Sequence, residues 1–191
     1  MRKIFLDIET KNTFQEVKSS DPTALDISLL VIYDSKNEEY LSFTPEEFTK
    51  LWPIIEHTDI IIGYNSDYFD IPLLNKYYPG DLTKIKSIDL MQEIKKFAGK
   101  RIPLDAVAAG TLGINKGGKG LDAVLWYRQG EIEKIRTYCQ QDVKITKELY
   151  EFANEYKFLR YKFFNDTTQI PIDTSNWDKL EKTSINLTMP W

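Results

Sequence analysis

The stretch FLDIET, residues 5–10, decides how the chain is expected to fold, because it joins an apolar strand to two carboxylates one residue apart. Side chains alternate along a strand, so Asp7 and Glu9 project to the same face as Phe5. The opposite face carries the aliphatic side chains of Ile4, Leu6 and Ile8. Like charges on an inner strand repel, and such hard oxygen ligands suit Mg²⁺ or Mn²⁺. The pair therefore predicts a cation site, with a merely exposed strand end as the alternative.

The composition predicts one soluble globular domain with a substantial core. The 191 residues are 42% hydrophobic, 13% aromatic and 28% charged, and no apolar run is long enough to span a bilayer. The single cysteine, Cys139, excludes an internal disulfide and favours a reducing compartment. The N-terminus does not resemble a signal peptide, so we expect a cytoplasmic protein without membrane contact.

The net charge of −4 argues against bulk adhesion to nucleic acid, but it hides a local basic segment. Residues 95–119 carry six lysines and arginines against one acid, Asp105. This segment could contact a phosphate backbone.

Hydrophobic periodicity and turn residues predict an α/β domain with a mixed central sheet flanked by helices. Strands are expected at 2–9, 26–33, 38–43, 59–65 and 85–89. Helices are expected after the N-cap Thr44, with a break near Pro53, and at 67–78, 89–98, 103–112, 121–128 and from 131 to about 158. We expect a main domain at 1–158 and a C-terminal extension at 159–191, with a hairpin and a weakly specified tail.

A second candidate site follows the strand in IIGYNSDYFDIPLL, residues 61–74. Asp70 lies near the strand-to-helix junction, where sites in α/β sheets commonly form. Asp67 in the same loop is interpreted as the helix N-cap. Taken alone, Asp70 is better interpreted as an acid in the first turn that stabilises the helix dipole.

A third candidate is YCQQD, residues 138–142, within the long helix. Tyr138 and Asp142 are four residues apart, so they project from one face about one turn apart. The same spacing recurs at Tyr77 and Asp81, but Pro79 and Gly80 lie between them and break helical geometry. Only the later pair is expected to act together.

Taken in order, these three motifs resemble those of the DEDD superfamily of 3′–5′ exonucleases. The segments YNSDYFDIPLL, IPLDAVA and IRTYCQQDV are particularly similar to the proofreading exonuclease domain of family B DNA polymerases. The likeness covers roughly residues 2–152 and implies an RNase H-like fold. A related branch has a histidine five residues before the last aspartate, where this chain has Thr137, so the resemblance is to the tyrosine-bearing branch.

The resemblance also implies a site with two divalent cations, Mg²⁺ or Mn²⁺, held by Asp7, Glu9, Asp70 and Asp142. Asp7 would bridge the ions, Glu9 and Asp142 would complete the site of the ion that carries the attacking water, and Asp70 would serve the second ion. Tyr138 would orient that water. The remaining candidates for substrate binding are Thr10, Asn65, Phe69, Lys116 and Lys119. For Phe69 a place in the core is an equal alternative.

The two lysines belong to GINKGGKG, residues 113–120, which fits most of a phosphate-loop pattern. The final position is Gly120 instead of Ser or Thr, and no strand precedes the segment, so an ATPase is not expected. A basic loop that contacts phosphates and a plain solvated loop both stay open.

The expected function is metal-dependent exonuclease activity on single-stranded nucleic acid, with DNA favoured over RNA and nucleoside 5′-monophosphates released from a 3′ end. A replication or repair protein is a possible partner. Two alternatives stay open: a catalytically silent module that binds nucleic acid, a polymerase or a helicase, and an RNase H-type endonuclease.

Overall fold

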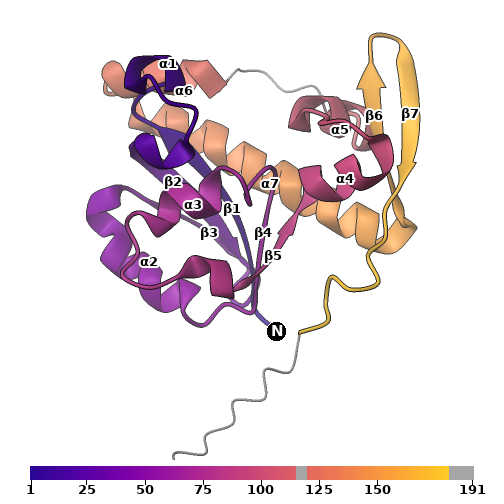
Figure 1. Cartoon of the computed structure of the whole chain (residues 1–191), viewed down its shortest axis with the longest axis horizontal. Helices are drawn as coiled ribbons and strands as arrows, with labels where there is room; N and C mark the ends of the chain where they lie inside the picture. Colours follow the sequence, from indigo (N-terminus) through magenta and orange to yellow (C-terminus); the bar gives the residue numbers. More distant parts are fainter. Residues whose placement is uncertain (115–119, 181–191) are drawn as a thin grey trace, which may run out of the picture.

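The computed structural model describes residues 1–114 and 120–180, which form a five-stranded sheet with helices on both faces and a separate hairpin (Figure 1). The strands are β1 (Lys3–Thr10), β2 (Ile27–Asp34), β3 (Glu39–Phe43), β4 (Ile60–Gly63), β5 (Lys86–Asp89), β6 (Phe158–Phe163) and β7 (Asp166–Pro171). The α-helices are α1 (Phe14–Val17), α2 (Phe48–Ile55), α3 (Asp70–Asn75), α4 (Leu90–Ala98), α5 (Leu104–Thr111), α6 (Gly120–Arg128) and α7 (Ile132–Tyr156).

The sheet has the order β3-β2-β1-β4-β5 and is mixed. β1 pairs antiparallel with β2, and β2 with β3. On its other side β1 pairs parallel with β4, which pairs parallel with β5. The predicted α/β fold with a mixed central sheet is therefore confirmed, and β1 lies at its centre.

The alternation predicted for β1 divides the interior into two cores. Phe5 belongs to the core beneath α4, α5 and α7. The residues of β1 that face the other core, against α2 and α3, are Ile4, Leu6 and Ile8. All four side chains are buried, so β1 is fixed in register by apolar packing on both of its faces.

The long helix α7 packs directly on β1, because its buried stripe follows the predicted three- and four-residue spacing. The stripe includes Ile135, Cys139, Val143, Thr146, Leu149 and Ala153. The Cys139 thiol is buried and donates a hydrogen bond to the Asp7 carbonyl oxygen at 3.2 Å. This contact brings the N-terminal third of α7 to the carboxyl half of β1.

Two helix predictions were wrong in detail. The helix expected at 67–78 begins only at Asp70, because the backbone amide of Asp67 donates to the Asp89 carboxylate at 3.2 Å and is held in the preceding loop. Asp67 is therefore not the N-cap, a position that Phe69 occupies. Pro53 does not break α2, which continues to Ile55, because a proline so near the end of a helix removes few of its hydrogen bonds.

The C-terminal extension forms the predicted hairpin and then packs on the main core. Leu159 and Ile170, which face each other across the hairpin, are both buried. Beyond it the Trp177 ring stacks on Tyr150 with 4.9 Å between centroids. Trp191 and the end of the tail lie outside the described residues. The division of the chain at residue 158 stays a prediction.

Within the described part of the chain, no helix is long and apolar enough to cross a membrane.

Candidate metal centre

The first two acids of the site lie at the carboxyl end of β1. Asp7 is half-buried and Glu9 is buried, and both project toward α7, on the face of the strand that Phe5 shares. The pairing of β1 with β2 shifts register between Glu9 and Thr10. Such irregularities interrupt the regular pairing of strands and change the direction of side chains. Here the shift comes where the chain leaves the sheet and enters the wall of the site.

The helix α7 supplies two more of the predicted residues. Tyr138 and Asp142 are both buried in the turn of the helix that faces β1. Asp7, Glu9 and Asp142 each offer one carboxylate oxygen, and these three oxygens lie within 4.8 Å of one another. Three acids from two elements far apart in sequence therefore converge to the spacing of ligands around a single cation.

Asp70, the first residue of α3, is the fourth acid and is also buried. Its Oδ1 atom has no hydrogen-bond partner among the described residues. Burial raises the pKa of this carboxyl well above its usual value, and the nearby charges of Asp7 and Asp89 raise it further. A buried carboxylate beside like charges is costly without a cation, so the donor set fits divalent metal.

These four acids line one open cavity of about 670 Å³ together with the other predicted residues that the structure describes. Its wall also includes Thr10, Asn65, Phe69 and Tyr138. Eight of the ten sequence-predicted site residues are thus brought together, and Lys116 and Lys119 lie outside the described residues. The ring of Trp126 contacts the Tyr138 ring edge-on at 5.8 Å and fixes its orientation.

The loop between β4 and α3 is shaped by residues that the motif pattern does not include. A Cβ atom on Gly63 would lie 2.4 Å from the Cβ of Ser66, so the loop folds back more tightly than any other residue allows. Asn65 has a positive φ of 66°, which asparagine tolerates better than most residues. The tight turn carries Asn65 into the cavity wall and sets the start of α3 at Asp70.

Asp89 holds this loop and is the main residue that the sequence interpretation missed. Its carboxylate accepts hydrogen bonds from the backbone amides of Asn65 at 2.8 Å and Asp67 at 3.2 Å, and it also caps α4. Burial raises its pKa above the usual value. Its position at the start of a predicted helix indicates a cap, but nothing local indicates that it also fixes the loop of the site.

Three further side chains of the cavity wall were also missed. The Phe14 ring meets Phe69 edge-on with 6.0 Å between centroids. Tyr64 donates to the Ile102 carbonyl oxygen at 2.6 Å, which joins the wall to the start of α5. Asp105 follows in the first turn of that helix. The available signal was an exposed aromatic close to an acidic motif, which is too common to single out Phe14.

Comparison with known proteins supports an RNase H-like fold. The sequence model of the RNase_H superfamily matches residues 4–154. Among solved structures, the family B DNA polymerase from the hyperthermophilic archaeon Pyrobaculum calidifontis is similar, with 20% sequence identity and a TM-score of 0.63. The similarity covers 81% of this chain but 24% of the polymerase chain. No curated protein sequence matches. The predicted likeness to RNase H-like proteins and to family B polymerases is thus confirmed in its fold.

Proposed function

This chain belongs to the RNase_H superfamily, and from that premise we propose that it is a metal-dependent 3′–5′ exonuclease. Its substrate would be single-stranded nucleic acid, DNA in the first place, from which it releases nucleoside 5′-monophosphates. The observation that carries the proposal is the convergence of Asp7, Glu9 and Asp142 within 4.8 Å, beside the buried Asp70. Direction and product follow from the resemblance of the three motifs to DEDD exonucleases.

In this proposal the four acids hold two divalent cations. Asp7, Glu9 and Asp142 would hold one, and Asp70 together with Asp7 would hold the second. When bound, such ions lower the pKa of a nucleophilic water, stabilise the leaving oxygen and reverse the sign of an acidic pocket, so that it can admit a phosphodiester. The acids also need the ions, because four carboxylates in one cavity repel one another.

The other residues of the cavity act on substrate and water. The Tyr138 hydroxyl orients the attacking water, and the ring is kept in place by Trp126. Phe69 offers a face or edge to the terminal base, with Phe14 beside it. Thr10 and Asn65 lie in the same wall, where their polar groups can bind the sugar-phosphate backbone.

The test is a gel assay on single strands labelled at the 5′ end, with Mg²⁺ or Mn²⁺ supplied or chelated. Wild type is compared with Asp7→Ala and Asp142→Asn. The matched control is Glu151→Gln, which neutralises an exposed acid of the same helix that pairs with Lys147. We expect progressive shortening from the 3′ end by wild type and the control, and none by the other two variants.

Each other outcome contradicts the proposal in its own way. Internal cuts from the first time point would indicate an endonuclease. Binding without cleavage in the presence of metal would indicate a silent binding module. Release of the 5′ label as a mononucleotide at the start of the reaction would reverse the proposed direction. The same assay on RNA strands, under identical conditions, decides whether the protein prefers DNA or RNA.

A further inference from the structure

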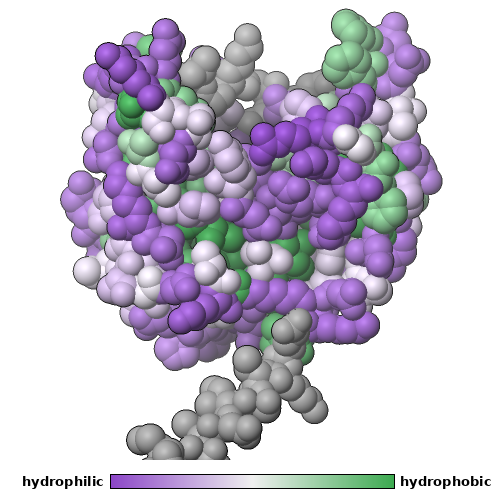
Figure 2. Space-filling view, in the orientation of Figure 1, coloured by the Kyte–Doolittle hydropathy of each residue, from purple (hydrophilic) through white to green (hydrophobic). Residues whose placement is uncertain are grey.

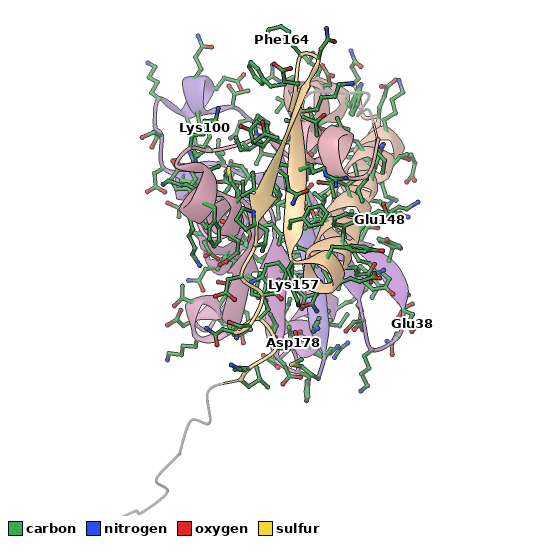
Figure 3. The ribbon with its side chains drawn as sticks, turned by 90° about the vertical axis from the view of Figure 1, so that its right-hand side faces the viewer. Glu38, Lys100, Glu148, Lys157, Phe164 and Asp178 are labelled. Carbon is green, nitrogen blue, oxygen red and sulfur yellow. The ribbon has the colours of Figure 1, made fainter. Side chains whose placement is uncertain are left out.

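The tip of the β6–β7 hairpin exposes two adjacent phenylalanines. The relative exposure is 64% for Phe163 and 86% for Phe164, and the two rings meet edge-on at 5.0 Å. Figure 2 shows apolar side chains gathered where this hairpin ends, and Figure 3 shows Phe164 at its outer end, beyond the body of the protein. Neither ring contributes to the apolar cores, so the fold does not require them.

The backbone conformation at the tip of the hairpin makes a phenylalanine unusual at position 164. Phe164 has a positive φ of 53°, a region that glycine and asparagine adopt easily and that a bulky side chain rarely adopts. It lies in the two-residue turn between Phe163 and Asp166, which pair across the hairpin. An aromatic ring held in an unfavourable conformation and exposed to solvent indicates a function outside the fold.

The hairpin is rigidly joined to the wall of the candidate metal centre through α5. The first turn of α5 lines the cavity with Leu104 and Asp105. At its other end, the Thr111 hydroxyl donates to the Arg160 carbonyl oxygen at 2.7 Å and accepts from the Arg160 amide at 2.8 Å. Gly110 has no room for a Cβ, which would lie 2.6 Å from the Tyr161 backbone. The helix α5 and the β6–β7 hairpin are therefore packed together as one rigid unit.

Basic and aromatic side chains lie near one another on the surface that leads from the cavity to the tip of the hairpin. Arg101 donates to the Asn65 side chain in the cavity wall at 2.7 Å and lies 5.2 Å from the centre of the Tyr68 ring. Lys100 lies 5.6 Å from the centre of the Tyr161 ring on the hairpin. Phe163 follows Tyr161 on the same face of β6, because side chains alternate along a strand, whereas Arg160 and Lys162 project from the opposite face. Figure 3 shows Lys100 beside the hairpin, on the side where Phe164 marks its end.

We propose that this row, here called the hairpin track, binds the single strand whose end lies in the metal centre. The track consists of Arg101, Lys100, Tyr161, Phe163 and Phe164. Cations at intervals neutralise phosphates, and the two exposed rings stack on bases, a combination that fits single-stranded nucleic acid better than a protein surface. The inference rests on the proposed function, because it assumes that the cavity receives a strand end.

The dimensions of the track set the strand length that can reach its tip. The helix α5 is about 12 Å long at 1.5 Å per residue. The hairpin adds about 13 Å between Arg160 and Phe164 at about 3.3 Å per residue. A strand that touches both the metal centre and the two rings therefore covers up to about 25 Å, or about seven nucleotides when its bases stack 3.4 Å apart. A trinucleotide cannot do so.

The test measures binding apart from cleavage, by fluorescence anisotropy in an Asp142→Asn background, with a trinucleotide and a 20-nucleotide strand. The tip is altered by Phe163→Ala together with Phe164→Gly. Each lost stacking contact weakens binding about five-fold or more, so we expect at least that loss for the 20-mer and no change for the trinucleotide. The matched control is Phe97→Ala, which removes an exposed ring from α4 outside the track.

Two further measurements exclude a structural explanation. The melting temperature should not fall, because glycine relieves the positive φ at position 164. Lys100→Ala should lower the slope of log affinity against log salt concentration by about 0.7, the value for one phosphate contact with a single strand.

The proposal is overturned if the tip variant binds the 20-mer as tightly as the background protein does, or if it loses both ligands equally. A variant that changes only self-association would assign the rings to a protein contact and would also overturn it. Binding by the track with no cleavage by the wild type would contradict the exonuclease and leave the track standing. The two failures are therefore distinguishable.

Discussion

Replacing Asp142 with asparagine should stabilise the metal-free protein, although it removes a residue of the site. The carboxylate oxygens of Asp7, Glu9 and Asp142 lie within 4.8 Å of one another. Two unit charges at 4.8 Å repel by about 3.5 kcal/mol at an effective dielectric constant of about 20. The asparagine side chain would keep nearly the same volume while removing the charge from two such pairs. The substitution therefore separates the electrostatic cost of the cluster from its packing.

The net gain is smaller than the sum of the pairs, because Asp7 is only half-buried and solvent screens its charge. We expect the free energy of unfolding in EDTA at pH 8 to rise by about 1–3 kcal/mol, or about 3–10 °C in melting temperature for a chain of this length. In magnesium, wild type should be more stable than Asp142→Asn. Wild type gains stability from the bound ion, by about 2.7 kcal/mol at a hundredfold excess over the dissociation constant, and the variant gains less.

The assay is thermal unfolding followed by circular dichroism, in EDTA and in magnesium, for wild type, Asp142→Asn and the control Glu151→Gln. The control loses an exposed ion pair and should change by no more than about 0.5 kcal/mol in either buffer. A variant that melts below wild type in EDTA would refute the repulsion. A variant that gains as much as wild type from magnesium would refute the role of Asp142 as a ligand.

Three further results are expected. Tyr138→Phe should slow strand shortening without abolishing it and should keep the full stabilisation by magnesium, since the hydroxyl orients water and does not hold metal; lost stabilisation would contradict this role. The pKa of the Asp70 carboxyl is raised in the folded, metal-free protein, so the fold favours the protonated form of this group. The contribution of Asp70 to stability is therefore complete below about pH 4, the ordinary pKa of an aspartate, and it is lost as pH rises through the raised pKa. In EDTA, wild type should therefore lose stability relative to Asp70→Asn as pH rises, in melts at several pH values, and a constant difference would be contrary to this. Gly63→Ala should cost about 1–3 kcal/mol in chemical unfolding, because its Cβ would meet Ser66 at 2.4 Å, and Ser66→Gly should restore much of that loss; an unaffected Gly63→Ala would show that the loop can relax.

The features that the sequence predicted correctly are those that depend on local periodicity. Alternation in β1 placed Asp7 and Glu9 on the face toward α7, and helical spacing placed Tyr138 and Asp142 on one face of the long helix. The order of the three motifs then indicated that these faces meet. Both elements are long and strongly patterned, which explains why their geometry was predictable.

The features that were missed depend on contacts between distant segments. Asp67 looked like a helix cap, but Asp89, more than twenty residues later, binds its amide and delays the helix to Asp70. Nothing near Asn65 in sequence indicates its hydrogen bond with Arg101. The position of Phe14 against Phe69 likewise depends on how the chain leaves β1. Such tertiary contacts override local propensity and cannot be read from spacing alone.

The most direct test of the metal centre is anomalous diffraction from crystals of the wild-type protein soaked in Mn²⁺. The proposal predicts two anomalous peaks in the cavity, one coordinated by Asp7, Glu9 and Asp142 and the other by Asp7 and Asp70. A cavity without anomalous signal at saturating manganese, or with its only ion held by residues other than these four, would contradict it.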